Sequence, residues 1–419
     1  MKRSKSLLLI YLLKWLGLSI VIGVLLGSVS AVFLKLLDWA TSTRENNPYL
    51  LYFLPVGGFL VALIYHFYGQ DVQKGNNLIL DEIHKPKNII RLRMAPMILI
   101  GTIVTHLFGG SAGREGTAVQ IGASISDQLT HIFHFNKSDR KTILIAGMAA
   151  GFGSVFGTPL AGGIFGLEVF LMGKIRYESL IPAFLSSIIA DMVTQHWWGV
   201  SHSKYIITNF PELTIKNILL ACVAGICFGL AGKLFSISIK LVKTTLSKYI
   251  KFQPYHAIIG GIIIILLTKA LGTYKYNGLG LETIMSSFSS QQPVYDFLFK
   301  IIFTAVTLGS GFKGGEVTCL FFIGSTLGNT LSKIINLPMS LLSGMGFVGV
   351  FAAASNTPIA CTVMAIELFG KEVGIYAAIA CIVAYLFSGH SGIYDSQVIG
   401  EEKHFTFFKD RGKKLGELQ

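Results

Sequence analysis

The chain has 419 residues, of which 52% are hydrophobic and only 14% are charged, and its formal net charge is +13. Its mean hydropathy of +0.61 lies far outside the range of soluble globular domains. This composition excludes a soluble protein and indicates an integral membrane protein. The five cysteines form no CxxC pair and the ten histidines show no ligand spacing, so we expect no disulfide framework, no metal site and no cofactor.

The first apolar segment, residues 7–34, follows the basic stretch "MKRSK". It is longer than the hydrophobic region of a signal peptide and contains Lys14, so we predict a retained first helix. Besides this basic stretch at residues 2–5, positively charged residues cluster at residues 85–93 and near the C-terminus. By the positive-inside rule this distribution places both termini in the cytoplasm, and we interpret the basic end as a solvated tail. The charges of that tail are Lys409, Arg411, Lys413 and Lys414.

Apolar segments recur along nearly the whole chain. Several are too short or too rich in glycine to cross a hydrocarbon core of about 30 Å, which takes about 20 residues. We therefore expect broken or re-entrant helices. Non-helical backbone at membrane depth is either buried in protein or lines a watery cavity, so such breaks tend to build sites.

An internal duplication divides the chain. The segments "FGTPLAGGIFGLEVF" (156–170) and "SNTPIACTVMAIELF" (355–369) share Thr-Pro, Ala, Glu and Phe at the same spacing. Two related halves around a shared interface are typical of transporters. Small residues also recur wherever membrane helices pack closely, but that alternative does not explain the repeated Thr-Pro and Glu. We predict a first repeat over residues 1–200, a second over 201–400, a short basic cytoplasmic tail over 401–419 and no soluble regulatory domain.

Each duplicated segment begins like a helix. Thr158 and Thr357 are suitable N-caps, and a proline follows each in the favoured first helical position. Glu168 and Glu367 then lie about 13 Å further along these helices. Because carboxylates in such segments cannot face lipid, we expect them to cap or pair inside the bundle.

The stretch "GGSAGREGTAVQIG" (109–122) places Arg114 and Glu115 between glycines, just before an apolar helix. A helix N-terminus offers unpaired N–H groups and about half a positive charge, so it binds anions. We expect Glu115, two residues before the helix, to occupy such a site when ionised and to swing away when protonated. One side chain would then couple anion movement to proton movement. The alternative is an interfacial Arg114–Glu115 ion pair in a loop.

Four segments carry a family resemblance: "GGSAGREGTAVQIGASI", "AGMAAGFGSVFGTPLAGGIFGLEVF", "GSGFKGGEVTCLFFIGSTLG" and "IY" at 393–394. In this order they resemble the hallmark regions of the CLC anion channels and transporters. The resemblance implies an all-α polytopic membrane protein of two inverted-topology repeats with many short, tilted and broken helices, and a homodimer with one anion pathway per subunit. Glu115 then matches the gating glutamate of the family's GREG motif and Tyr394 its central anion-coordinating tyrosine. Without the resemblance, Tyr394 would be read as an interfacial aromatic anchor.

Departures from the chloride-type members indicate the subtype. The first anion-binding segment reads "KGNNLI" in place of Gly-Ser-Gly-Ile-Pro, Thr117 replaces the proline after GREG, and "GGEVTC" replaces a Gly-Gly-x-Phe-x-Pro segment. Val169 stands where proton-coupled chloride members carry a second glutamate. These features resemble the fluoride/proton antiporter clade. The resemblance implies that Asn76, Glu316 and Thr318 belong to the fluoride pathway.

Under this resemblance Glu115 and Glu316 are the candidate coupling residues. Fluoride is small and strongly hydrated, so strong donors must replace its water, and an Asn amide offers two donors where a serine hydroxyl offers one. The two asparagines after Gly75 could equally form only a turn. Glu316 repels anions unless it is protonated, paired or used in proton exchange. The candidate anion-binding residues are Asn76, Asn77, Gly113, Arg114, Gly116, Val317, Thr318 and Tyr394.

The predicted function is export of fluoride in exchange for protons by a secondary transporter, not an enzyme. Chloride/proton exchange or a passive anion channel of the same fold is the main alternative. An intramembrane serine hydrolase, with Ser111 or Ser310 as nucleophile and His106 as base, lacks the strand-turn-helix context of that motif. Without a long regulatory tail in the sequence, we expect a multi-pass protein of a prokaryotic plasma membrane. Its partners are fluoride, protons and lipid, with no nucleic acid.

Overall fold

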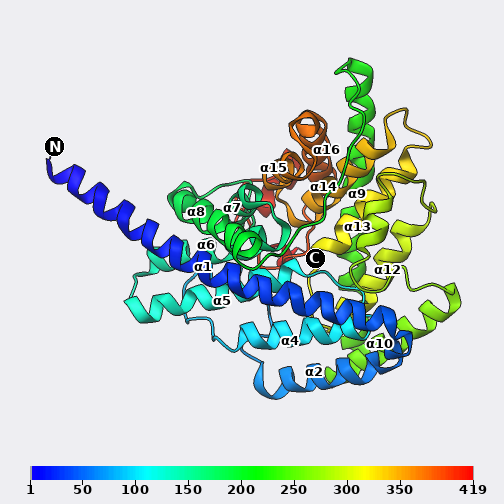
Figure 1. The fold of residues 1–419 in the computed structure, drawn as a ribbon, viewed down its shortest axis with the longest axis horizontal. Helices are drawn as coiled ribbons and strands as arrows, with labels where there is room; N and C mark the ends of the chain where they lie inside the picture. The colour runs from blue at the N-terminus through cyan, green and yellow to red at the C-terminus, as the bar shows by residue number, and fades with distance from the viewer. Residues whose placement is uncertain (1, 419) are drawn as a thin grey trace.

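The computed structural model describes residues 2–418, apart from the side chains of residues 2–8 and 406–408. The basic cluster at residues 2–5 therefore falls on side chains outside the described part. The described chain is mostly helical, with the two halves packed side by side (Figure 1). The first half forms α1 (Lys2–Asn46), α2 (Leu54–Tyr68), α3 (Asn76–His84), α4 (Met94–Leu107), α5 (Glu115–Phe133), α6 (Lys137–Phe156), α7 (Pro159–Glu168) and α8 (Leu180–Met192). The second half forms α9 (Ile215–Tyr249), α10 (Pro254–Leu271), α11 (Leu281–Ser286), α12 (Asp296–Gly309), α13 (Val317–Leu331), α14 (Met339–Ser355), α15 (Pro358–Phe369) and α16 (Gly374–Phe387).

Helix lengths differ widely. Within the described residues, four helices are long and apolar enough to cross a membrane: Leu9–Asn46, Pro48–Tyr68, Ile215–Tyr249 and Pro254–Leu271. By contrast, α7 has 10 residues and α13 has 15, which at 1.5 Å per residue gives about 15 and 22 Å against a hydrocarbon core of about 30 Å. The short, broken helices expected from the sequence are confirmed.

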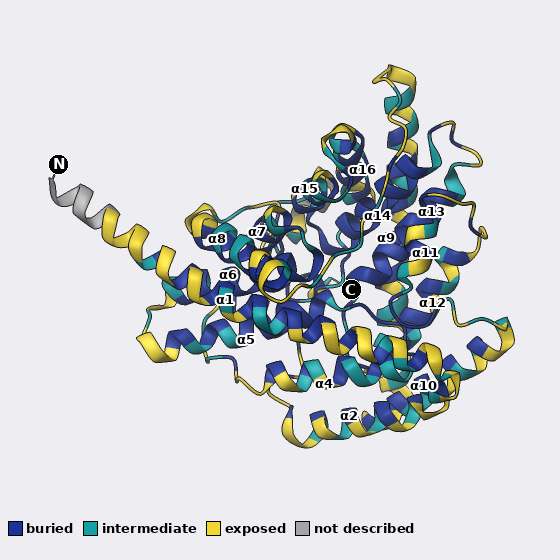
Figure 2. Ribbon diagram, viewed as in Figure 1, coloured by how far each residue is buried: buried dark blue, intermediate teal, exposed yellow. Residues whose placement is uncertain are grey.

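Burial divides the helices into an inner and an outer group (Figure 2). Every residue of α14 after Met339 is buried, whereas α2 and α10 each turn large apolar side chains outward. Leu60, Ile64 and Phe67 on α2 and Ile262 and Leu266 on α10 are all exposed. An exposed apolar stripe of this size on a helix of spanning length faces lipid. The chain is therefore a multi-pass membrane protein.

The two halves repeat the same close pairing of helices. α5 packs along α6 in the first half, and α13 packs along α14 in the second. In each pair a glycine lies against a glycine carbonyl of its partner helix, Gly122 on Gly147 and Gly324 on Gly346. A Cβ at Gly122 or Gly324 would overlap that neighbouring backbone. Small residues thus set the helix separation, and the duplication repeats this packing.

The duplicated Thr-Pro helices, α7 and α15, cap each other across the repeats. The Glu168 carboxylate accepts hydrogen bonds from two backbone N–H groups in the first turn of α15, at 3.2 and 2.9 Å. The Glu367 carboxylate accepts two from the first turn of α7, both at 2.8 Å. The expectation that these glutamates cap or pair inside the bundle is confirmed.

The N-cap threonines of these helices need a correction. Thr158 and Thr357 do occupy the N-cap positions with proline next to them. Their side chains, however, form no capping hydrogen bond within the described chain. The carboxylates from the opposite repeat satisfy N–H groups of the first turn instead, and a charged acceptor there is also favoured by the helix dipole.

The C-terminal segment packs against the bundle through its apolar residues, while Lys409, Arg411 and Lys413 are exposed as expected of a solvated tail. β2 (Val398–Ile399) pairs in parallel with β1 (Leu171–Met172), and Leu415 is fully buried. Lys414 forms an ion pair of 2.5 Å with Asp81 of α3. The sequence does not reveal the partner of Lys414, because Asp81 lies on a distant segment.

Candidate functional site

The two repeats meet where α5 and α13 begin. Gly113 and Gly315, each two residues before its helix, exchange backbone hydrogen bonds of 2.5 and 2.8 Å in an antiparallel bridge. This bridge aligns α5, which begins at Glu115, with α13, which begins at Val317. Two helix N-termini, each with unpaired N–H groups and partial positive charge, therefore converge on one point.

The Glu115 carboxylate lies between the N-termini of α5 and α13. Glu115 is fully buried and accepts hydrogen bonds from the Thr318 backbone N–H at 3.1 Å and the Thr318 hydroxyl at 2.5 Å. The Arg114 backbone N–H donates to it at 3.1 Å. The carboxylate that the sequence predicted at a helix N-terminus is present, but its position and its partner differ from the prediction in two respects. Glu115 is the first residue of α5 rather than two residues before it, and its carboxylate binds α13 of the other repeat.

Glycines around Glu115 allow this close approach. A Cβ at Gly113 would lie 3.0 Å from the Glu115 carboxylate and 3.0 Å from the Thr318 nitrogen. A Cβ at Gly116 would lie 3.1 Å from the side-chain nitrogen of Asn76. A Cβ at either position would be in tight contact with these groups or with the Gly315 backbone, so glycine allows the two repeats to approach closely here.

Arg114 is the N-cap residue of α5 and lies beside Glu115. Its Nε is 3.5 Å from Glu115 Oε1, and its side chain is only 11% exposed. Within the described residues Nε has no hydrogen-bond partner. The Arg114–Glu115 ion pair of the alternative interpretation is therefore present, but Glu115 is fully buried and its carboxylate is held by hydrogen bonds from Thr318 as well.

Glu316 is the N-cap residue of α13, so in the aligned repeats it corresponds to Arg114. The residue equivalent to Glu115 is Val317, which is apolar and buried. Glu316 Oε2 is inaccessible and has no hydrogen-bond partner in the described part of the chain, and a Cβ at Gly116 would lie 3.4 Å from it. An unpaired buried carboxylate oxygen is costly. This oxygen is available to a proton or to a donor that the surrounding residues do not supply.

Asn76 and Tyr394 line one narrow cavity, together with Val169. Asn76 is the first residue of α3, and Gly75 before it has a φ of +56°. The Asn76 side-chain oxygen is buried and unpartnered among the described residues, and Tyr394 is only 4% exposed. Asn76 therefore lies at a helix start, and its side-chain oxygen makes no turn hydrogen bond with the described residues. Tyr394 lies in the interior of the protein rather than at the membrane interface.

Asn77 makes a contact within the protein. Its side-chain oxygen accepts the Ser396 backbone N–H at 2.9 Å, two residues after Tyr394. The nearby Gln397 side chain donates to the Val169 carbonyl at 2.7 Å. These bonds hold the loop that carries Tyr394 against α3 and the end of α7, so in this structure Asn77 positions the cavity wall.

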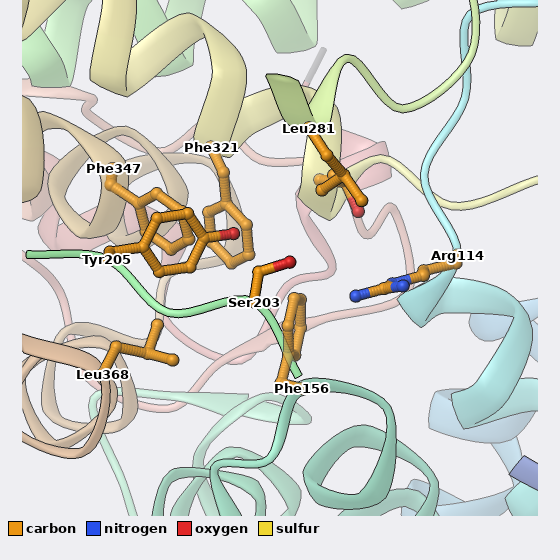
Figure 3. A pocket seen from close by; sticks show the side chains of 9 residues that line it. Arg114, Phe156, Ser203, Tyr205, Leu281, Phe321, Phe347 and Leu368 are labelled. Atoms are coloured by element: carbon orange, nitrogen blue, oxygen red, sulfur yellow. The ribbon is translucent and has the colours of Figure 1, made fainter. Parts of the chain in front are cut away.

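A second narrow cavity lies against Arg114 and Thr318 (Figure 3). Its wall includes Ser203 and Tyr205, which belong to the irregular segment between α8 and α9 at residues 198–214. Neither residue stands in a recognisable motif. The one available signal is the length of that segment, because long loops without secondary structure are uncommon in compact proteins and are usually functional.

Comparison with known proteins identifies the family. Residues 57–389 match the family model of the voltage-gated chloride channels. The chain belongs to this CLC family. It is 51% identical over 403 residues to a chloride/fluoride channel protein of Pseudomonas syringae pv. tomato. The aligned region covers 95% of this chain and 89% of that protein.

Solved structures agree with this CLC assignment. The crystal structure of a CLC-type fluoride/proton antiporter matches with a TM-score of 0.89 and 36% identity, over 92% of this chain and 98% of that one. The structure of a slow cyanobacterial Cl⁻/H⁺ antiporter matches with a TM-score of 0.77 and 18% identity, over 89% and 94% of the two chains. The second likeness shows the fold alone. The CLC fold that the motifs predicted, with its inverted repeats of short and broken helices, is confirmed.

Two polar residues near the GREG motif of this CLC protein have partners of their own. The Thr117 hydroxyl shares a hydrogen bond of 2.7 Å with the Thr102 hydroxyl and so ties α5 to α4. The Ser111 hydroxyl shares one of 2.9 Å with Thr304, while His106 Nε2 faces the Gly113 carbonyl at 3.5 Å. The hydrolase alternative needs His106 on the Ser111 hydroxyl, and the geometry of these described residues does not provide it.

Proposed function

We propose that this CLC protein exports fluoride in exchange for protons. The observation that carries the proposal is the buried Glu115 carboxylate, held by Thr318 at the N-terminus of the other repeat's helix. When ionised, Glu115 occupies the anion site; when protonated, it loses the charge that α13 stabilises and leaves the site to an anion. Anion and proton therefore use one position in turn, which couples their movements.

Fluoride is favoured over chloride by two features. The relatives at 51% and 36% identity are named as a chloride/fluoride channel protein and a fluoride/proton antiporter. Asn76 lines the cavity that Tyr394 shares, and its amide supplies two donors to a small anion that gives up its water. We assign Asn76, Thr318 and Tyr394 as side-chain contacts of fluoride, with backbone N–H groups near Gly116 and Val317 completing the path.

We expect purified protein in liposomes to release fluoride much faster than chloride, and Asn76→Ser to reduce that preference about three- to tenfold, because one hydrogen-bond donor is lost. Ion-selective electrodes for both anions and a pH electrode follow the efflux together. Asn336→Ser, at an exposed position between α13 and α14, is the matched control. Equal rates for the two anions in the unmodified protein would remove the fluoride assignment, and unchanged selectivity in Asn76→Ser would leave that residue with a structural role.

Glu316→Gln is expected to slow coupled transport by on the order of tenfold or more, because a positioned carboxyl group that exchanges a proton is lost. The amide has nearly the shape of the carboxyl group, and Glu316 Oε2 has no partner to lose among the described residues, so the protein should still fold. Fluoride and proton fluxes are measured together with the elution profile in size-exclusion chromatography. Normal fluxes of both ions would assign Glu316 a purely structural role.

The name of the Pseudomonas relative favours a second candidate, a passive anion channel of the same fold. A channel dissipates an anion gradient without driving protons uphill, whereas an exchanger moves protons against their gradient. Val169 lines the Asn76 cavity where a second glutamate would stand in chloride/proton exchangers. We propose that Glu316 supplies the proton route in its place.

We further propose a homodimer with one pathway per subunit, in a prokaryotic plasma membrane with both termini cytoplasmic. The adjoining helices α7, α8, α15 and α16 expose apolar side chains that a second copy can cover, namely Leu160, Ile181, Ile359, Ile375 and Ile382. Light scattering of the detergent-solubilised protein tests the dimer, and labelling of cysteines introduced near either end tests the orientation.

A further inference from the structure

The cavity beside Arg114 is separate from the one that Asn76 and Tyr394 line, since none of the described residues lines both. Thr318, which holds the Glu115 carboxylate, belongs to the Arg114 cavity. An anion displaced from the Glu115 site therefore has this space directly beside it. The function proposed above assigns fluoride contacts to the Asn76 cavity and to Thr318, and it gives no role to Ser203 and Tyr205 in the Arg114 cavity.

Polar groups from two distant parts of the chain face each other across this cavity. In Figure 3 the Arg114 guanidinium and the Ser203 hydroxyl point toward one another, and the Tyr205 hydroxyl is turned to the same side. Much of the remaining wall is aromatic, with Phe156 and Phe321 among its members. An apolar space with a few convergent donors is the usual form of a small-ligand site.

The charge of Arg114 favours an anion in this space. Its one ion pair with a described residue is the 3.5 Å contact with Glu115, and its Nε has no hydrogen-bond partner there. When Glu115 takes up a proton, the nearly buried guanidinium has no carboxylate left in contact and interacts only at longer range with Asp38 of α1, which is unfavourable. A free anion between Arg114 and the hydroxyl groups restores the balance.

The segment that carries the hydroxyl groups is held in place although its backbone is irregular. The Tyr205 ring packs against Phe347 with ring centroids 5.2 Å apart. The Tyr376 hydroxyl donates to the carbonyls of Pro211 and Glu212 at 3.2 and 3.1 Å. The donors therefore have fixed positions before an anion arrives, and little ordering is required on binding.

We propose that Arg114, Ser203 and Tyr205 form an anion-binding station next to the Glu115 site, which receives a small hard anion such as fluoride while Glu115 is protonated. The proposal rests on the proposed exchange function and deepens it, since it assigns capture of the anion on one side of Glu115 to the segment between the repeats. The guanidinium supplies charge, and the two hydroxyl groups supply the short hydrogen bonds that replace water.

Ser203→Ala and Tyr205→Phe, alone and together, test the station because each removes one hydroxyl group and keeps the surrounding packing. The apparent KM for fluoride should rise about three- to tenfold for each lost hydroxyl. The maximal rate and the number of protons moved per fluoride should not change. Tyr376→Phe is the matched control, because it removes a hydroxyl that anchors the same segment but does not line the cavity.

An unchanged KM in the double variant would overturn the station, and so would an equal rise in Tyr376→Phe, which would show that only the position of the segment matters. Titration of sodium fluoride into purified Glu115→Gln protein by calorimetry decides the point without transport. Adding Ser203→Ala to that protein should weaken fluoride binding, and equal binding would refute the station. Failure of the proposed function would instead show as absence of fluoride-driven proton movement in the unmodified protein.

Discussion

We expect Glu115→Gln to abolish the proton movement that a fluoride gradient drives. The carboxamide cannot exchange a proton near neutral pH, and it carries no charge for the N-terminus of α13 to stabilise. The variant therefore resembles the permanently protonated state. The remaining fluoride flux is either a leak or close to zero, because an exchanger stalls when its cycle cannot close. The decisive measurement is the proton signal from liposomes with fluoride imposed as the only gradient.

Glu282→Gln serves as the control for this experiment, since Glu282 is an exposed carboxylate in α11. Its proton signal should equal that of the unmodified protein. Uphill proton transport that persists at the normal rate in Glu115→Gln would exclude Glu115 as the coupling residue. The GREG motif would then be a packing element whose buried carboxylate only joins the two repeats.

The second large effect is expected for Glu168→Gln, which should destabilise the folded protein by about 2–4 kcal/mol, because hydrogen bonds to charged groups contribute about 1.5–3 kcal/mol each. The carboxylate satisfies two N–H groups at the start of α15. Glutamine keeps one acceptor oxygen and turns an NH₂ group toward the other N–H. Glu367→Gln should cost less, since Glu367 is more exposed than Glu168.

Thermal stability in detergent, followed by the loss of the monodisperse peak in size-exclusion chromatography, measures both variants. The double variant should lose less than the sum of the single effects, because both carboxylates act on the same packed pair of helices. Glu372→Gln is the control, since Glu372 is exposed just beyond α15. Melting of the double variant at the temperature of the unmodified protein would contradict the reciprocal capping.

The sequence carried enough information to locate the repeats and the chemistry at their centre. Thr-Pro and Glu at matched spacing marked α7 and α15 and indicated caps or pairs for Glu168 and Glu367. The glycines around Arg114 and Glu115 indicated a carboxylate at a helix start. Such signals are readable because they depend on neighbouring residues, through proline geometry, glycine and the N–H groups that every helix leaves unpaired.

The identity of each partner could not be read in the same way. Glu115 binds Thr318, 203 residues away, and the equivalence of Arg114 with Glu316 appears only when the Gly113–Gly315 bridge aligns the two helices. The packing of the tail could not be read either, because the Asp81 partner of Lys414 lies on α3.

Composition, the duplicated Thr-Pro segments and the GREG motif thus determined by themselves that this is a membrane protein with two repeats and a carboxylate at a helix N-terminus. Only the tertiary structure decided which helix that carboxylate binds, and that Ser203 and Tyr205 face Arg114 across a cavity. The physical reason is that a helix start is a local property of a few residues. The juxtaposition of two helix starts depends instead on backbone contacts between glycines of different repeats, such as Gly116 and Gly315.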